Sequence, residues 1–186
     1  MEISNIDEYV NDITNKVSSI DVLFNDVINQ YSNNLDELML EIRNNILNID
    51  TVPIATIEQY FIKLSTEVYF VSSTIEKLGL FDSISKAKAQ ETYNQKYLEY
   101  QHTNDGVVGA KKPTVAEITA RAETASLYDS TLNDVYNKAY KTVKNKISAA
   151  ETMISTLSKI LSHRMQESQL TTQQTERQIL NESNVF

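Results

Sequence analysis

The chain has 186 residues with no cysteine, no tryptophan, 3 glycines and 2 prolines, and its net charge is −8. The lack of cysteine excludes a disulfide scaffold, a thiolate metal site and a cysteine nucleophile, and the glycines follow neither the dinucleotide-binding nor the P-loop spacing. No apolar run is long enough to span a membrane, and the acidic start lacks the basic region of a signal peptide. We therefore expect a soluble, cytoplasmic protein with no membrane partner.

The negative charge is concentrated near the N-terminus. Residues 1–50 hold ten acidic side chains and two basic ones, so the rest of the chain is balanced. A pI near 4.8 argues against general affinity for polyanions, because proteins that bind nucleic acid usually carry a basic surface. A local basic face in the second part of the chain is compatible with this balance, and so is an ordinary solvated helical surface.

An apolar residue recurs every three or four positions near the N-terminus. The series consists of Ile6, Val10, Ile13, Val17, Ile20, Phe24, Val27 and Tyr31. This heptad spacing predicts a helix that packs on another copy or back on its own chain. After Tyr31 the series is displaced by one residue, so a short interruption near Asn33 or a second helix fits equally well. We expect residues 1–50 to form an acidic coiled-coil segment.

Two helices are expected in the middle of the chain. Pro53 marks a helix boundary, because the residue before a proline disfavours helical dihedrals. The apolar stripe that follows predicts a helix from about Ile54 to Leu78, and Gly79 is placed as its C-terminal stop. A further helix is predicted over about residues 83–100. The segment 102–113 collects turn-forming residues and is the clearest loop.

The last helix is predicted to be long. Thr114 and Glu117 have the spacing of a capping box, which opens a helix. An apolar series at steps of 4 and 3 then runs from Leu132 to Leu161, while Ser and Asp at 126–130 favour a break because they compete for backbone hydrogen bonds. From residue 167 onward Gln, Thr, Ser and Asn predominate, which predicts a flexible tail.

These elements predict an all-α fold of elongated helical hairpins with an N-terminal coiled-coil segment. The expected divisions are the acidic segment 1–50, a helical core domain 51–166 and a polar tail 167–186. The N-terminal seam and the apolar stripe of the last helix offer more apolar length than one small chain can cover. We therefore expect a homo-oligomer.

The usual ingredients of an active site are missing from the sequence. His102 and His163 stand in no metal-ligand spacing, and there is no nucleophile-elbow motif. Paired carboxylates such as Asp36 and Glu37 are expected on a solvated face. We expect no enzyme, no bound metal and no cofactor.

Tyrosines and lysines form two clusters of interest. Tyr93, Tyr97 and Tyr100 recur on one helical stripe, accompanied by Lys86, Lys88 and Lys96 and, beyond the loop, by Lys111 and Lys112. A second cluster consists of Lys138, Lys141, Lys144 and Lys146, in a stretch without acids. Aromatic rings beside lysines can stack unpaired bases while the ammonium groups neutralise phosphates. The other interpretation is a buried tyrosine face with solvated lysines at its flanks.

The order of these features resembles the UvsY-type recombination mediators of phages. The resemblance covers about residues 54–167. It rests on the basic and aromatic stretch from Lys86 to Tyr100, the polar loop, the segment from Lys112 to Arg121, and the long helix containing Lys141 and Lys144.

The resemblance implies a small, helical, self-associating protein of the host cytoplasm that binds single-stranded DNA and has no enzymatic activity. It implies that the protein helps a RecA-like recombinase to displace a single-strand-binding protein. The DNA-binding candidates are Lys86, Lys88, Lys96, Tyr97, Tyr100, Lys111, Lys112, Lys141 and Lys144.

The chain also departs from the family. The family is usually basic, its Arg-Gly element is replaced here by Lys144-Asn-Lys-Ile, and the N-terminal 50 residues have no counterpart. The alternative is an oligomeric coiled-coil structural or adaptor protein, for example of a phage virion, without a nucleic-acid role.

Overall fold

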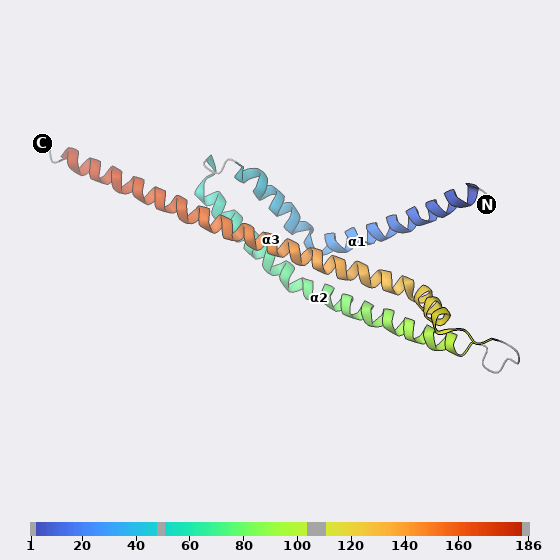
Figure 1. The fold of residues 1–186 in the computed structure, drawn as a ribbon. Helices are drawn as coiled ribbons and strands as arrows, with labels where there is room; N and C mark the ends of the chain where they lie inside the picture. The colour runs from blue at the N-terminus through green and yellow to red at the C-terminus, as the bar shows by residue number, and fades with distance from the viewer. Residues whose placement is uncertain (1–2, 48–50, 104–110, 184–186) are drawn as a thin grey trace. The chain divides into compact units, whose positions relative to one another are not determined.

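Three long helices make up the described part of the protein. The computed structural model describes residues 3–47, 51–103 and 111–183, with side chains for all of these except 3–14, 16 and 178–183. Helix α1 spans Ile3–Ile46, α2 spans Ile54–Gln101 and α3 spans Val115–Ser183 (Figure 1). No strand occurs in these ranges, so the described chain is all-α, as the sequence predicts. None of the described helices is long and apolar enough to cross a membrane.

Each helix is longer than the sequence patterns indicate. Helix α2 continues through Gly79, so the predicted stop at this glycine and the separate helix over about 83–100 are wrong. Helix α1 is continuous across Asn33, and α3 is continuous across residues 126–130, where a break was expected. In this part of α3 Ser126 is itself buried, as are Ala122 before it and Val135 after it. Tertiary packing therefore outweighs the weak preference of serine and aspartate for other backbone conformations.

Gly79 serves close packing of α2 on α3. A Cβ atom at this position would lie 3.2 Å from Cε2 of Tyr140. A glycine inside a helix costs about 1 kcal/mol relative to alanine, and the burial of the adjacent Leu78 and of Ile75 on the same helix compensates. The glycine therefore marks a helix contact, not a helix end.

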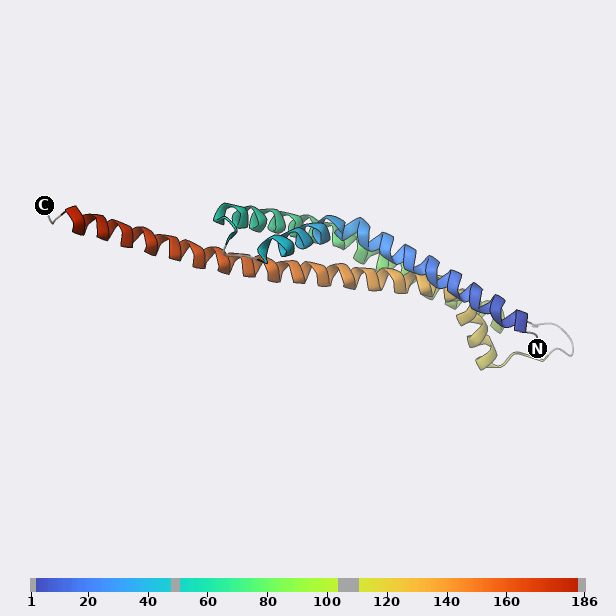
Figure 2. The same ribbon diagram turned by 90° about the horizontal axis from the view of Figure 1, so that it is seen from above.

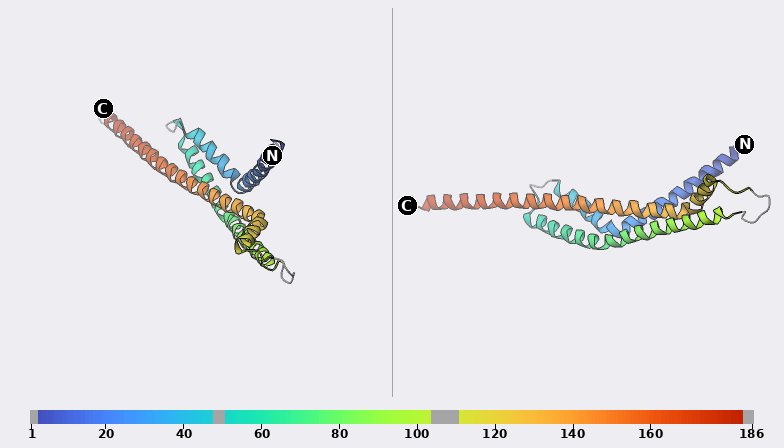
Figure 3. Two further views of the ribbon diagram at one scale, coloured as in Figure 1. Left: turned by 45° about the vertical axis from the view of Figure 1, so that its right-hand side comes forward. Right: turned by 60° about the horizontal axis from the view of Figure 1, so that its bottom comes forward.

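The helices are divided between two compact units. Unit 1 comprises Met1–Tyr31 and Thr74–Lys144, and unit 2 comprises Ser32–Ser73 and Asn145–Phe186. Within unit 1, the second half of α2 runs antiparallel to the first part of α3 (Figures 1 and 3). The three segments expected from composition, 1–50, 51–166 and 167–186, stay a prediction.

Polar contacts fix the register of α2 against α3 in unit 1. The side-chain amide of Asn133 donates to the Asp82 carboxylate at 3.2 Å and to Ser85 Oγ at 3.1 Å. The amide of Asn137 donates to both carboxylate oxygens of Asp82, at 3.1 and 3.2 Å. Further along, Thr92 Oγ1 donates to the Asp129 carboxylate at 2.6 Å. These groups are partly buried, so a shift by one helical turn would leave them without partners.

Unit 2 has an apolar core in which parts of all three helices meet (Figure 2). Its most buried side chains are Leu35, Ile42, Ile57, Leu64 and Leu157. Long-range polar contacts surround this core: the Lys146 ammonium contacts Ser32 and Asp36, and Arg164 Nη1 donates to the Val52 carbonyl at 2.6 Å. The predicted apolar stripes of α2 and α3 are thereby confirmed as buried faces.

The predicted starts of α2 and α3 are also confirmed. The backbone N–H of Thr114 donates to Glu117 Oε2 at 2.8 Å, and the N–H of Glu117 donates to Thr114 Oγ1 at 3.3 Å. This is the reciprocal capping box, and the bonds from Thr114 lower the pKa of Glu117. At the start of α2, the Pro53 carbonyl accepts from the N–H groups of Thr56 and Ile57.

The two ends of the chain differ from expectation in detail. Helix α3 continues to Ser183, although its side chains from Met165 to Arg177 are all exposed. In the N-terminal heptad series, the side chains of Ile6, Val10 and Ile13 lie outside the described residues. Val17 and Ile20 are exposed, and Val27 is buried. The apolar residues of the series are therefore exposed in the first described part of α1 and become buried further along the helix.

Enlarging Gly79 should destabilise the protein. In Gly79→Leu the new side chain meets the Tyr140 ring, and such overpacking costs about 1–3 kcal/mol in the free energy of unfolding. The matched control is Ala87→Leu at an exposed position of the same helix, where a change within about 0.5 kcal/mol is expected. Urea denaturation followed by circular dichroism measures both, and equal stabilities would contradict the packing role of Gly79.

Tyr60 should make stability depend on alkaline pH. The Tyr60 side chain is buried and its hydroxyl donates to Glu41 Oε1 at 3.2 Å. Burial, followed by this bond, raises the pKa of the phenol above its usual 10.0. Below pH 10.0 the bond therefore adds about 1 kcal/mol to the free energy of unfolding. This contribution is lost as the pH rises through the higher pKa of Tyr60 in the folded protein. The melting-temperature difference between the parent and Tyr60→Phe should shrink above this pH. The exposed Tyr69→Phe is the control, and a pH-independent Tyr60 difference would refute the assignment.

Candidate nucleic-acid interface

The end of the α2–α3 hairpin in unit 1 brings aromatic and basic side chains together. Because the two helices are antiparallel, Tyr100 near the end of α2 lies beside Arg121 near the start of α3. Both line one shallow hollow of about 340 Å³, whose other walls are Ala120, Thr124 and Ala125. Tyr97 and Tyr100 are half-buried. The hollow therefore has one aromatic ring, one guanidinium group and small side chains around it.

The tyrosine stripe is neither fully buried nor free in solvent. The rings of Tyr93 and Tyr97 lie with centroids 6.1 Å apart and planes tilted by 35°. Both side chains are half-buried, as is Tyr100. Both interpretations of the stripe, a packed face and a stacking surface, therefore stay predictions.

Two of the candidate lysines form ion pairs on their own helix. Lys96 Nζ lies 2.7 Å from Glu99 Oε2, and Lys88 Nζ lies 3.2 Å from Glu91 Oε2. The hydrogen bond with Glu99 and its negative charge raise the pKa of Lys96. Exposed pairs of this kind are weak, so a phosphate can displace the carboxylate, but the local positive charge is smaller than the lysine count indicates.

Lys111 and Lys112 are exposed on the segment that leads into α3. The carboxylate of Glu117 has its pKa lowered mainly by the bonds from Thr114, and the charges of Arg121 and Lys111 add to this effect. Arg121 and Lys111 therefore lie close to the same carboxylate.

The remaining candidates lie elsewhere in unit 1. Lys86 lines a different hollow together with Tyr93 and, from α3, Glu123. Lys141 and Lys144 are exposed on α3 next to Tyr140, which packs at Gly79. Tyr100 lies 21 residues beyond Gly79 on α2, about 30 Å at 1.5 Å per residue. The nine candidates therefore do not form one site.

The sequence missed one residue and misplaced another. Arg121 was not among the candidates, although its position four residues after Glu117 puts it on the same helical face as the capping box. Lys146, placed in the second lysine cluster, instead makes an ion pair with Asp36 in unit 2. The position of Arg121 beside Tyr100 and the pair of Lys146 with Asp36 do not follow from the sequence pattern, because both depend on which helices lie side by side.

The described residues contain no cluster of three or more His, Cys, Asp or Glu side chains that could hold a metal ion. His163 Nδ1 lies 3.5 Å from Glu167 Oε1, on the exposed part of α3. Comparison of the chain with protein-family models, curated proteins and solved structures finds no match in any of the three.

Neutralising Glu99 should lower the pKa of Lys96. In Glu99→Gln the hydrogen-bonded negative charge is lost, so we expect the Lys96 pKa to return toward its usual 10.5. The matched control is Glu91→Gln, which removes the partner of Lys88 and should leave Lys96 unchanged. NMR titration of the lysine side chains measures both variants, and an unchanged Lys96 pKa in Glu99→Gln would show that the pair does not persist in solution.

Proposed function

We propose that the protein binds single-stranded DNA at the end of the α2–α3 hairpin and acts, without catalysis, as a recombination mediator of the UvsY type. In this function it helps a RecA-like recombinase to replace a single-strand-binding protein. The observation that carries the proposal is the hollow shared by Tyr100 and Arg121.

The chemistry of this hollow suits an unpaired base. A tyrosine ring offers a face for stacking, and a guanidinium group either stacks on a base or binds a phosphate through its planar fork. Ala120 and Ala125 offer no side-chain hydrogen bond to a base edge, and the Thr124 hydroxyl donates to the Ala120 carbonyl of its own helix at 2.8 Å. Such a site favours binding that is independent of sequence, which is what a mediator requires.

The basic residues around the hollow supply the electrostatic part of the proposal. Lys96, Lys111 and Lys112 surround the hairpin end, and phosphates that bind there release counterions. Lys86, Lys88, Lys141 and Lys144 lie outside the hollow; in this proposal they contact the backbone of a longer strand. The acidic excess of the chain belongs to residues 1–50, so it does not arise from the hairpin end itself.

A second candidate function is an oligomeric structural or adaptor protein with no nucleic-acid role. The observation that favours it is the group of large apolar side chains left exposed in unit 1, among them Leu127 and Tyr128. Apolar patches of this kind mark surfaces for partner proteins. Both candidates predict self-association, so only nucleic-acid binding separates them.

Binding of a fluorescent single-stranded oligonucleotide tests the proposal. Tyr100→Ala should weaken binding by about 1–3 kcal/mol, the usual contribution of one stacked base. Lys96→Ala and Arg121→Ala should weaken binding to all sequences alike, and each should reduce the salt slope by about one. Anisotropy titrations at two salt concentrations measure these effects, and Tyr97→Ala reports whether the neighbouring ring contributes.

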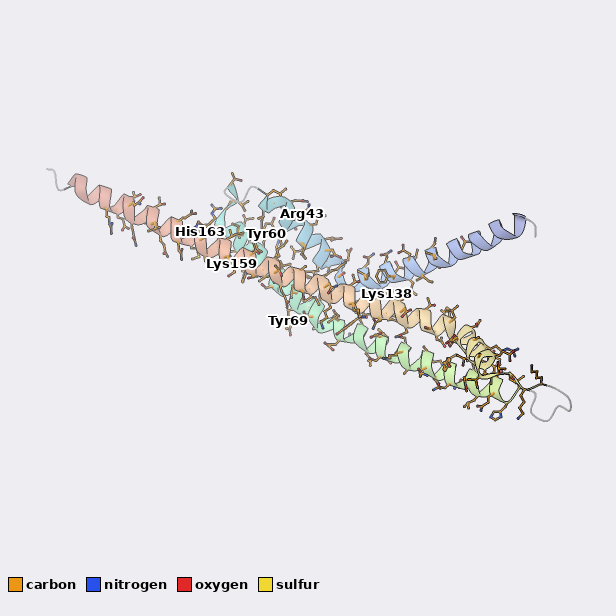
Figure 4. All side chains as sticks on the ribbon, viewed as in Figure 1. Arg43, Tyr60, Tyr69, Lys138, Lys159 and His163 are labelled. Carbon is orange, nitrogen blue, oxygen red and sulfur yellow. The ribbon has the colours of Figure 1, made fainter. Side chains whose placement is uncertain are left out.

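Matched controls come from exposed residues of unit 2. Tyr69→Ala and Arg43→Ala remove the same side-chain types from α2 and α1 (Figure 4) and should leave affinity unchanged. Melting temperatures of all variants separate binding from packing. If the parent fails to bind at low salt, or if Tyr100→Ala lowers the melting temperature while affinity is unchanged, the proposed site is wrong and the structural function is favoured.

A further inference from the structure

An apolar groove runs between α1 and α3 in unit 1. It has a volume of about 650 Å³, and its apolar walls are Ile20 and Leu23 of α1 and Leu127, Tyr128, Leu132 and Val135 of α3. Leu127 and Tyr128 are 62% and 78% exposed. Nothing within the described chain covers these side chains, so the groove offers apolar surface to another molecule.

Carboxylates flank this groove. Asp21 and Asp134 line the hollow that adjoins it, which also includes Ile20 and Val135. Lys138 is the one basic residue of that hollow. A helix that enters the groove should therefore present apolar residues with basic side chains beside them.

The outer face of α2 in unit 1 carries apolar residues with basic side chains beside them. Leu80, Phe81 and Ile84 are all about half exposed or more, and Lys77 and Lys88 precede and follow them at helical spacing on the same face. We call these five residues the outer stripe. Phe81 stacks on Tyr136 with ring centroids 5.8 Å apart, which holds this ring in place. The nearby Asp82 points inward to Asn133 and Asn137, so it adds no acid to the stripe. Lys88 pairs with Glu91 on its own helix at 3.2 Å, so the positive charge of the stripe comes mainly from Lys77.

Other segments of the chain fit the groove less well. Residues 1–50 carry eight net negative charges, so a second α1 would face Asp21 and Asp134 with like charges. Among the described side chains of the last part of α3, up to residue 177, the large exposed apolar residues are Met165 and Leu170. They are five positions apart and so do not lie on one helical face.

We propose that the groove of one copy receives the outer stripe of α2 from a second copy. Because groove and stripe are different surfaces of the same unit, the contact is heterologous, and each copy can donate one stripe and accept another. Such contacts propagate into a closed ring or an open filament. The proposal goes beyond nucleic-acid binding and does not rest on it, although the stripe includes Lys88, which the proposed function assigns to a longer strand.

Two single charge insertions test the contact. Leu127→Glu places a carboxylate in the groove, and Ile84→Glu places one in the stripe. Light scattering at micromolar concentration should give a multiple of 21.2 kDa for the parent and the mass of one chain for each variant. A mixture of the two variants retains one intact groove and one intact stripe per pair, so it should form dimers and stop at that size.

The control is Ile62→Glu, which alters an exposed position of α2 in unit 2 and should keep the parent mass. Circular dichroism confirms that each variant is helical, and Tyr128→Glu and Leu80→Glu replace any variant that is not. The proposal is overturned if the parent is monomeric, which would assign the groove to a different molecule. It is also overturned if either variant keeps the parent mass, or if the mixture stays monomeric or regains the parent mass.

Discussion

The contact of α2 with α3 in unit 1 is the feature on which the rest of that unit depends. Gly79 lets the helices approach at Tyr140, and the Asp82 carboxylate accepts hydrogen bonds from Asn133 and Asn137. Apolar packing alone tolerates sliding between two helices, whereas partly buried polar groups require specific partners. This register places Tyr100 beside Arg121 at the hairpin end. It also leaves Leu80 and Ile84 on the outer face of α2.

Acidic and basic side chains are concentrated in different parts of the protein. The acidic excess belongs to residues 1–50, and one of its carboxylates, Asp36, is engaged by Lys146 within unit 2. The hairpin end carries basic residues, but Glu99 and Glu117 lie among them. Its attraction for phosphate is therefore local and salt-sensitive. A weak, exchangeable contact of this kind would suit the proposed mediator, which releases a strand to another protein.

The hollow at the hairpin end and the apolar groove adjoin each other in unit 1, since Thr124 lines both. If copies join by groove and stripe, Tyr100 and Arg121 stay outside the contact, because these two residues belong to neither the groove nor the stripe. An assembly would then present several hairpin ends to one strand. Linked sites of modest affinity raise the overall affinity without any new contact. Self-association would in this way compensate for the small positive charge of a single hairpin end.

How far the sequence alone determines this protein is seen at individual residues. The apolar periodicity fixed the fold class and the buried faces of α2 and α3, and Thr114 with Glu117 fixed the start of α3, because these features depend only on nearby residues. The continuity of α2 through Gly79 depended on a ring 61 positions away in the chain, which no local pattern reports. The same holds for the site: lysines and tyrosines were visible in the sequence, but only the packing of α2 on α3 separated Lys141 and Lys144 from Tyr100 and placed Arg121 beside it. Local spacing determines which face of a helix is buried, whereas the partner of that face is chosen by contacts between residues far apart in the chain.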